Sequence, residues 1–410
     1  MTFINKGQPA VTHLAKKLAS IKPSATLDVT AKVADLKAAG VDVISLGAGE
    51  PDFDTPDNIK EAAIRAIREG KTKYTKVDGI PELKEAIAKK FRRENGLSFG
   101  TDQISVNCGS KHTIYNALVS SLEPGDEVVI PSPYWVSYPD MVMLVGGVPR
   151  FIETSLGSGM KITPETLDKA ITPRTRWLIF NSPSNPTGAT YTRNEMKALG
   201  QVLLQYPQVL IMTDDIYEHI VYDDFEFETL AAVVPELFDR ILTTNGVAKS
   251  YAMTGWRIGF AGGPVDLIKA MAKVQSQSTS NPCSISQWAS VEALNGPQDF
   301  IAERRTAFQQ RRDHVVRRIG EISGLSCTNP KGAFYVFVNC EELLGKTMPL
   351  GGTTESDVEF IAYLLDHGHV ATVPGSAFGM SGHFRISYAT SLDAVKEACD
   401  RIDTACAALE

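Results

Sequence analysis

The sequence predicts an α/β protein in which a large domain, built on a mostly parallel sheet, is followed by a smaller α+β domain. Between about residues 50 and 290, short apolar runs alternate with segments of helical periodicity, the pattern of strands and helices wound into one sheet. After about residue 297 this alternation gives way to a long charged helix and isolated extended runs. We therefore divide the chain into an N-terminal segment (1–45), a large domain (46–296) and a small domain (297–410).

The helices of the large domain carry start and stop signals. One ends at Gly70, and the next begins at Pro81 and ends before Gly96, as helix termini commonly do. Thr192 and Glu195 form a capping box that starts another. Helices are accordingly predicted over residues 57–70, 81–95 and 111–122 and from 192 onward.

The strands of the large domain appear as short apolar runs. These runs are continuous rather than alternating, which is typical of strands buried on both faces of a sheet. They cover residues 126–131, 175–181, 209–214, 241–246 and 258–262. We expect a seven-stranded type of sheet, with ligands bound beyond the carboxyl ends of its parallel strands.

The small domain has a different order of elements, and we expect the N-terminal segment to pack on it. The predicted elements are a helix over about 297–320, a strand at 333–339, a helix from Ser356 to Gly368, a strand at 383–389 and a terminal helix.

The overall charge and the cysteines exclude several classes of function. There are 41 basic and 48 acidic residues, and the resulting net charge of −7 argues against partners such as nucleic acid or an anionic membrane. The six cysteines form no C-x-x-C pair, so neither a zinc site nor a disulfide framework is indicated, and we expect no metal. No run of 18 apolar residues and no signal peptide is present, which predicts a cytoplasmic protein.

Two familiar motifs fail on their context. Gly47 and Gly49 begin a dinucleotide-binding pattern, but Asp52 stands where the third glycine belongs. Residues 96–100 match G-x-S-x-G by letter, yet they follow a helix and precede a strand, the reverse of a nucleophile elbow. We interpret both as chance matches.

Polar residues that a structural sheet does not need follow the predicted strands. The run 209–214 closes on Asp214, and Tyr217 comes three residues later. An acid at the end of a buried strand is costly unless it faces a cation. After 175–181, prolines fix a turn that directs Asn185 over the sheet edge.

Cationic residues occupy the other strand ends. The run 241–246 leads to Lys249, and Arg257 follows eight residues later. The turn 107–111 precedes a helix, so its backbone N–H groups can bind an anion. An amine, a phosphate site, an acid and a phenol together are what pyridoxal phosphate requires.

The chain resembles the fold-type I, class I aminotransferases, within the branch that contains bacterial aspartate aminotransferases and prephenate aminotransferases. The resemblance covers nearly the whole chain, in the segments LGAGEPDFDTP (46–56), KYTKVDGIPELKEAIAKKF (73–91), PSPYWVSYP (131–139), NSPSNPTG (181–188), DDIYEH (214–219), NGVAKSYAMTGWRIG (245–259) and FRISYATS (384–391). Their order and spacing together make it specific.

The resemblance implies roles for the residues that would hold pyridoxal phosphate. Lys249 is the Schiff-base lysine and the base that moves the proton from Cα, and Asp214 pairs with the pyridine nitrogen. Tyr217 and Asn185 bond the phenolic oxygen, and Trp135 stacks on the ring and faces the substrate.

Further residues are implied for the phosphate. Ser110 and Lys111 supply backbone N–H groups, and Arg257 makes a bidentate contact. Tyr74 resembles the tyrosine that reaches the phosphate from the neighbouring subunit, which implies a homodimer with shared active sites. One departure stands out: Gly246 and Ala248 occupy positions where many relatives carry hydroxyl residues, so one or two phosphate contacts are either missing or replaced by Asn245 or water.

The implied substrate contacts involve two carboxylates. Arg385 binds the α-carboxylate through two parallel hydrogen bonds. The alternative role for Arg385 is a buried ion pair that only supports the fold. Gly47 lets that carboxylate approach closely, and Asn185 lies nearby. Thr26 and Lys111 match the positions that hold the far carboxylate in this branch.

The resemblance implies a ping-pong aminotransferase that moves an amino group from aspartate or glutamate to a 2-oxo acid, and it leaves open whether prephenate is also a substrate. The alternatives are an aromatic or alanine aminotransferase of the same fold, a cofactor-dependent C–S lyase, and a transcription regulator built on this fold. The last needs a DNA-binding module, and we expect none before residue 40.

Overall fold

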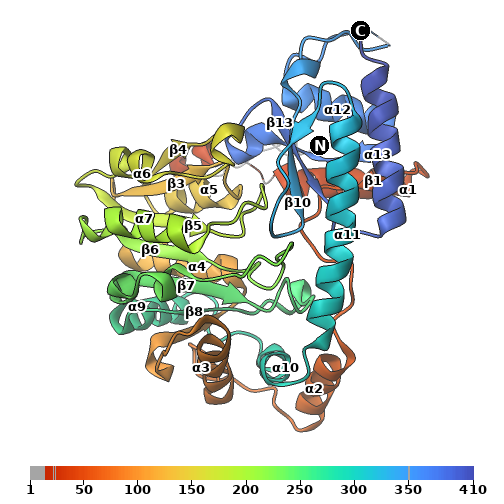
Figure 1. The fold of residues 1–410 in the computed structure, drawn as a ribbon. Helices are drawn as coiled ribbons and strands as arrows, with labels where there is room; N and C mark the ends of the chain where they lie inside the picture. The colour runs from red at the N-terminus through yellow and green to blue at the C-terminus, as the bar shows by residue number, and fades with distance from the viewer. Residues whose placement is uncertain (1–13, 22, 24, 350) are drawn as a thin grey trace, which may run out of the picture.

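The computed structural model describes residues 14–21, 23, 25–349 and 351–410, and a seven-stranded sheet forms its larger part (Figure 1). In spatial order its strands are β2 (Ile104–Asn107), β8 (Gly259–Gly262), β7 (Ile241–Gly246), β6 (Leu210–Asp214), β5 (Thr175–Asn181), β3 (Glu127–Ser132) and β4 (Val148–Glu153). The strands from β7 to β4 run parallel, whereas β8 is antiparallel to both β7 and β2. The predicted mostly parallel sheet is confirmed.

Both faces of this sheet are buried, which explains the continuous apolar runs. Along β5, Leu178 and Phe180 pack into one core and Trp177 and Ile179 into another. The first core is completed mainly by α2 (Asp57–Arg68), α3 (Pro81–Asn95), α6 (Pro164–Ala170), α7 (Arg193–Leu204), α8 (Leu230–Val233) and α10 (Ser284–Asn295). The second is completed by α4 (Ser110–Ser121), α5 (Ser137–Leu144) and α9 (Val265–Ser276).

The C-terminal elements form a second, smaller part, in which helices pack on an antiparallel sheet. Its antiparallel sheet has the order β12 (Val373–Pro374), β13 (His383–Ser387), β10 (Tyr335–Asn339) and β9 (Ser326–Cys327). The helices α11 (Asp299–Glu321), α12 (Asp357–Gly368) and α13 (Leu392–Ala407) complete its core. The long helix α11 runs from this part down to α10 and α2, beside the large sheet (Figure 1).

A helix and a strand within residues 25–45 contact the smaller part, whereas Lys17, in the short helix Lys16–Ser20, donates to the Leu144 carbonyl oxygen of α5 in the larger part at 3.0 Å. Helix α1 (Ala25–Ala38) places Val33 in a cluster with Leu365 and Ala371. Strand β1 (Ile44–Ser45) pairs in parallel with β11 (Val370–Ala371). The boundaries at residues 45 and 296 stay predictions.

Candidate active site

A cavity of about 380 Å³ opens at the carboxyl ends of the parallel strands, where the large sheet meets the smaller part. Its lining includes all but two of the residues that the sequence analysis singled out. The residues predicted there that do line it are Thr26, Ser110, Lys111, Trp135, Asn185, Asp214, Tyr217, Lys249, Arg257 and Arg385. Residues from seven separate segments of the chain therefore meet in one place.

Asp214 ends β6 and presents a half-satisfied carboxylate to this cavity. Its Oδ2 accepts a hydrogen bond of 2.5 Å from the Tyr138 hydroxyl, whereas its Oδ1 is buried and has no partner among the described residues. Burial raises the pKa of Asp214, and the Tyr138 hydroxyl and the charge of Lys249 counteract this rise. The free acceptor atom fits a ligand that brings an N–H group.

Lys249 follows β7, and its amine is desolvated. Its Nζ donates a hydrogen bond of 2.6 Å to the Gly49 carbonyl oxygen and forms no ion pair with the described residues. Burial lowers the pKa of Lys249 to about 8, further aided by the charges of Arg385 and Arg257, while Glu50 and Asp214 oppose the decrease. A primary amine with such a pKa is largely neutral at mildly alkaline pH and is therefore a nucleophile.

Arg385 lies on β13 and is 1% exposed, yet no carboxylate neutralises it within the described chain. Its Nη1 donates to Asn185 Oδ1 at 2.9 Å and its Nη2 to the Gly47 carbonyl at 2.6 Å. Its Nε has no partner, and its guanidinium lies 4.5 Å from the centre of the Tyr335 ring. A buried cation with an unused donor is suited to an incoming anion.

The N-terminus of α4 forms an anion-binding cradle. Ser110 and Lys111 occupy its first turn, where backbone N–H groups lack helical acceptors. A side chain on Gly259 would collide with the Ser110 backbone, so glycine is needed there for β8 to pass this turn. Arg257 adds a positive charge beside the turn and lines the same cavity.

Tyr217 and the mouth of the cavity complete the predicted set. The Tyr217 hydroxyl lies 2.9 Å from that of Tyr335, and burial raises its pKa well above the ordinary value. At the mouth, the Lys111 ammonium lies 4.9 Å from the centre of the Trp135 ring. Burial, together with the charge of Arg257, lowers the pKa of Lys111.

Two predicted residues lie outside the lining of this cavity. The Gly47 carbonyl binds Arg385, and a Cβ at this position would come within 3.1 Å of Val29 in α1. Gly47 therefore supports the arginine and allows α1 to pack. Tyr74 is 91% exposed, so its own chain gives its side chain no site to fill.

The lining residues that the sequence reasoning missed include Glu50, Tyr138, Asn181 and Tyr335. Three of them lie in segments that carried the family resemblance, but nothing in their spacing marked them out. Tyr335 is in the run predicted as a plain strand. Asn181 donates to the Asp214 backbone carbonyl at 2.7 Å, so it fixes the end of β6 beside β5.

Asn245, which the sequence analysis considered as a replacement for the hydroxyl groups absent at Gly246 and Ala248, does not face the cavity. Asn245 is 3% exposed and does not line the cavity. Its side chain donates to Glu218 and accepts from the Gly246 backbone N–H. The side chain of Asn245 therefore supplies no direct contact to a ligand there.

Comparisons of the sequence and the structure identify the family of this chain. Residues 41–402 match the family described as aminotransferase class I and II, and the chain belongs to that family. Membership implies pyridoxal phosphate as the cofactor and amino acids and 2-oxo acids as substrates.

Closely similar relatives include aspartate and aspartate/prephenate aminotransferases. The chain is 60% identical to the aspartate/prephenate aminotransferase of Cereibacter sphaeroides over 399 residues, which cover 97% of this chain and all of that protein (100%). The aspartate aminotransferase structure from Rhizobium meliloti has a TM-score of 0.94 at 56% identity and covers 98% of this chain and 100% of its own.

A third similar structure is the Thermus thermophilus aspartate aminotransferase with maleate, with a TM-score of 0.90, 44% identity, and coverage of 96% of this chain and 100% of that chain. The predicted fold-type I architecture and the predicted aminotransferase branch are confirmed. Within the described residues, no helix is long and apolar enough to cross a membrane.

Proposed function

We propose that this protein transfers the amino group of aspartate or glutamate to a 2-oxo acid at the cavity described above, with pyridoxal phosphate bound to Lys249. The observation that carries the proposal is the pairing, in one cavity, of the desolvated Lys249 amine with the unpartnered Asp214 Oδ1. The amine can form an imine with the aldehyde group of this cofactor, and the unpartnered oxygen can accept a hydrogen bond from its pyridine N–H.

The residues present also fit the rest of the cofactor. The first turn of α4 and Arg257 would hold the phosphate, and Trp135 would cover one face of the ring. Tyr217 and Asn185 would bond the phenolic oxygen. When bound, pyridoxal phosphate supplies an electron sink that makes the Cα–H of an attached amino acid acidic.

The chain then has three tasks in catalysis. Asp214, whose ionised form is favoured by the hydrogen bond from the Tyr138 hydroxyl, would hold the proton on the ring nitrogen. Arg385 orients the substrate through its α-carboxylate. Lys249 Nζ would accept the proton from the substrate Cα and deliver it to the carbon on the other side of the substrate nitrogen, which is general acid–base catalysis by a positioned amine.

The second carboxylate of the substrate would lie at the mouth of the cavity. Thr26 from α1 and Lys111 from α4 line it there, and they offer a hydroxyl and an ammonium rather than a rigid guanidinium fork. The Thermus relative was solved with maleate, a dicarboxylate, which supports this assignment. We include prephenate as a further acceptor because the relative from Cereibacter carries that substrate in its name.

The exposed Tyr74 supports a homodimer with shared sites. The Tyr74 side chain is 91% exposed and so is free to reach another subunit, and in the proposed dimer it contacts the phosphate bound by the partner. A cytoplasmic location remains a prediction.

The proposal is tested by borohydride reduction of the purified, cofactor-loaded protein, followed by peptide mapping and a two-substrate transamination panel. We expect the reduced adduct on Lys249 and none in Lys249→Ala. Aspartate and glutamate should be better donors than alanine or phenylalanine. An adduct on another peptide would overturn the site, and release of pyruvate and ammonia without a 2-oxo acid would indicate a lyase instead.

A further inference from the structure

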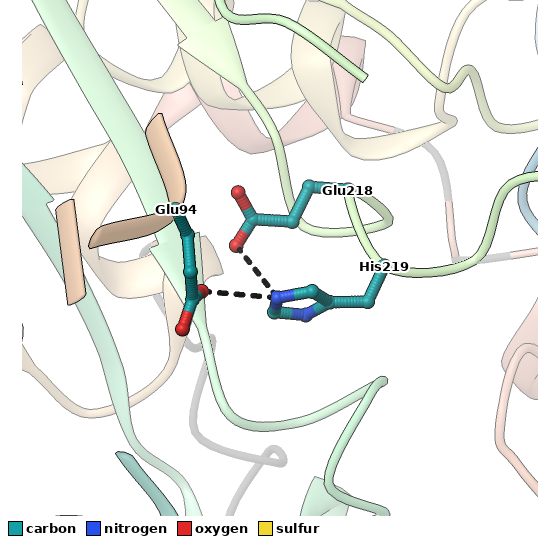
Figure 2. Close-up of side chains that lie close together, drawn as sticks. All are labelled: Glu94, Glu218 and His219. Carbon is teal, nitrogen blue, oxygen red and sulfur yellow. Dashed lines mark hydrogen bonds and ion pairs between the residues drawn. The ribbon is translucent and has the colours of Figure 1, made fainter. Parts of the chain in front are cut away.

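A buried polar network lies outside the cavity, between α3, the turn after β6 and the end of β7. Its members are Lys90, Glu94, Asn95, Glu218, His219 and Asn245, and none of them lines the cavity. Figure 2 shows its outer arm, in which His219 Nε2 lies 3.0 Å from Glu94 Oε2 and 3.8 Å from Glu218 Oε1.

The network is balanced by a lysine. The Lys90 ammonium pairs with Glu218 and lies 3.5 Å from Glu94 Oε2, so the two carboxylates already share a cation. Glu94, Glu218 and His219 lie close enough together to bind a metal ion, but Lys90 takes the place that the charge of such an ion would fill. A structural role therefore fits this cluster better than a metal site.

Glu218 is held in one position by three donors. Besides Lys90, the Asn95 amide donates to its Oε2 at 2.7 Å and the Asn245 amide to its Oε1 at 2.8 Å. Its side chain is 3% exposed, so water cannot replace these donors at low cost. The fixed carboxylate in turn fixes the side chain of Asn245.

Asn245 transmits this position to the phosphate cradle. Its Oδ1 accepts the Gly246 backbone N–H at 2.8 Å, and its backbone carbonyl accepts the Ser110 hydroxyl at 2.9 Å. The Ser110 hydroxyl is therefore used as a donor within the protein, which leaves the backbone N–H groups of Ser110 and Lys111 for an anion. Gly246 and Ala248 have no side-chain donor to offer a phosphate. Binding of the phosphate therefore depends more strongly on the position of the first turn of α4.

We propose that Glu218 and Asn245 are positioning residues that fix the N-terminus of α4 against β7 and thereby set how tightly the cofactor's phosphate is held. The inference rests on the proposed function, because it assumes that the cradle takes a phosphate. The physical reason is the short range of the effect: N–H groups and the helix dipole stabilise an anion only within the first turn.

The test compares two aldehydes that differ only in the phosphate. The full-length apoprotein is titrated with pyridoxal phosphate and with pyridoxal, and tryptophan fluorescence reports both dissociation constants. In Asn245→Ala the affinity for pyridoxal phosphate should fall about tenfold, as expected for loss of one buried hydrogen-bonded link, while that for pyridoxal should change less than about twofold. His219→Gln, which alters only the outer arm, is the matched control and should leave both constants unchanged.

A second variant and a coupling measurement decide the case if Asn245→Ala folds poorly. Glu218→Gln keeps the shape of the side chain but replaces one acceptor oxygen with a donor, and it should reduce selectivity for the phosphorylated aldehyde at least about threefold. In the double variant Asn245→Ala/Ser110→Ala, the two losses should be less than additive, because both act through the same turn.

Two results would overturn the inference while leaving the proposed function intact. One is an equal loss of affinity for both aldehydes, which would mean that the network supports the fold as a whole. The other is unchanged affinity for both. Failure of either aldehyde to bind the unaltered chain would instead reject the proposed function.

Discussion

Two arginines, equally buried, show how the site region differs from the rest of the molecule. Arg312 on α11 and Arg385 on β13 are each 1% exposed, and each lies over a tyrosine ring. Arg312 donates to both oxygens of Asp223 at 2.7 Å and to Asp313 at 2.7 Å. Among the described residues, Arg385 donates hydrogen bonds only to an amide oxygen and a backbone carbonyl, and its Nε has no acceptor.

Two lysines repeat this contrast. Lys90 is 1% exposed and pairs with Glu218 and Glu94, whereas Lys249 donates only to the Gly49 carbonyl oxygen. A buried charge without a counter-charge costs free energy in the folded protein. Removing a paired cation therefore leaves a carboxylate uncompensated and should destabilise the fold, whereas the unpaired cations of the cavity are suited to binding a ligand. The following variants test this distinction.

Arg385→Ala should have the largest effect. It removes the charge-assisted hydrogen bonds that we propose Arg385 donates to the substrate carboxylate, so kcat/KM for aspartate should fall roughly 150-fold to 25,000-fold, a loss of about 3 to 6 kcal/mol of transition-state stabilisation. The free energy of unfolding of the apoprotein should stay within about 1 kcal/mol, because no ion pair is broken. Steady-state kinetics and denaturant unfolding check both values, and a large loss of stability with unchanged kinetics would show that Arg385 is structural.

Arg312→Ala should give the opposite pattern. It deprives Asp223 and Asp313 of their shared cation, although Asp223 keeps its contact of 2.7 Å with Lys331 and both acids are partly exposed to solvent. We therefore expect a loss of about 2 to 3 kcal/mol of unfolding free energy, less than for a fully enclosed pair. The kcat/KM of the folded variant should remain within about threefold of the parent, measured below its unfolding transition. A loss of kcat/KM as large as that of Arg385→Ala would abolish the distinction.

The contrast between these cations could be predicted from the sequence only in part. The resemblance singled out Lys249 and Arg385, and helix signals such as the capping box at Thr192 placed α7 correctly. Whether an arginine has an acid beside it depends on contacts across the chain, and Asp223 lies 89 positions from Arg312. The sequence therefore left open the alternative of an ion pair for Arg385.

The fold was also predicted in part. The five apolar runs became strands of the large sheet, but β4 was not recognised, and β2 was noted only as a strand after residues 96–100, without bounds. The short β2 lies at one end of the sheet, and the largely exposed β4 lies at the other, so neither has a long buried run. The antiparallel direction of β8 was not predictable either, because an apolar run carries no sign of strand direction.

The pH dependence of cofactor capture tests the unpaired lysine. The pKa of Lys249 is lowered from 10.5 to about 8, and only the neutral amine attacks an aldehyde. The rate of pyridoxal phosphate binding to the apoprotein should therefore rise about tenfold from pH 7 to pH 9 and level off above that, followed by stopped-flow absorbance. A rate that keeps rising in proportion to hydroxide up to about pH 10 would show an ordinary, solvated lysine.

The same pKa shift fixes the sign of a stability change. The unfolded chain binds a proton at Lys249 up to about pH 10.5, whereas the folded apoprotein loses it near pH 8. Between these values the unfolded state binds more protons, so the contribution of Lys249 to the free energy of unfolding rises with pH. Lys249→Ala should lack this rise, which makes it the matched control for denaturant unfolding at pH 8 and pH 10.

Substitution of Lys111 at the cavity mouth should have the smallest effect on kcat/KM. Like the other cations of the cavity, Lys111 has no counter-charge among the described residues, but it is in contact with solvent. It forms no ion pair with the described residues, and its ammonium lies 4.9 Å from the centre of the Trp135 ring. Lys111→Ala should lower kcat/KM for aspartate by about 1 kcal/mol, roughly fivefold, since solvent screens the lost attraction to the far carboxylate. With alanine, which lacks that carboxylate, kcat/KM should change less than about twofold. Lys111→Arg keeps the charge and should retain most of the activity toward aspartate. If Lys111→Ala lowers kcat/KM equally for the substrates alanine and aspartate, Lys111 acts on the cofactor alone. The second carboxylate of aspartate is then recognised elsewhere.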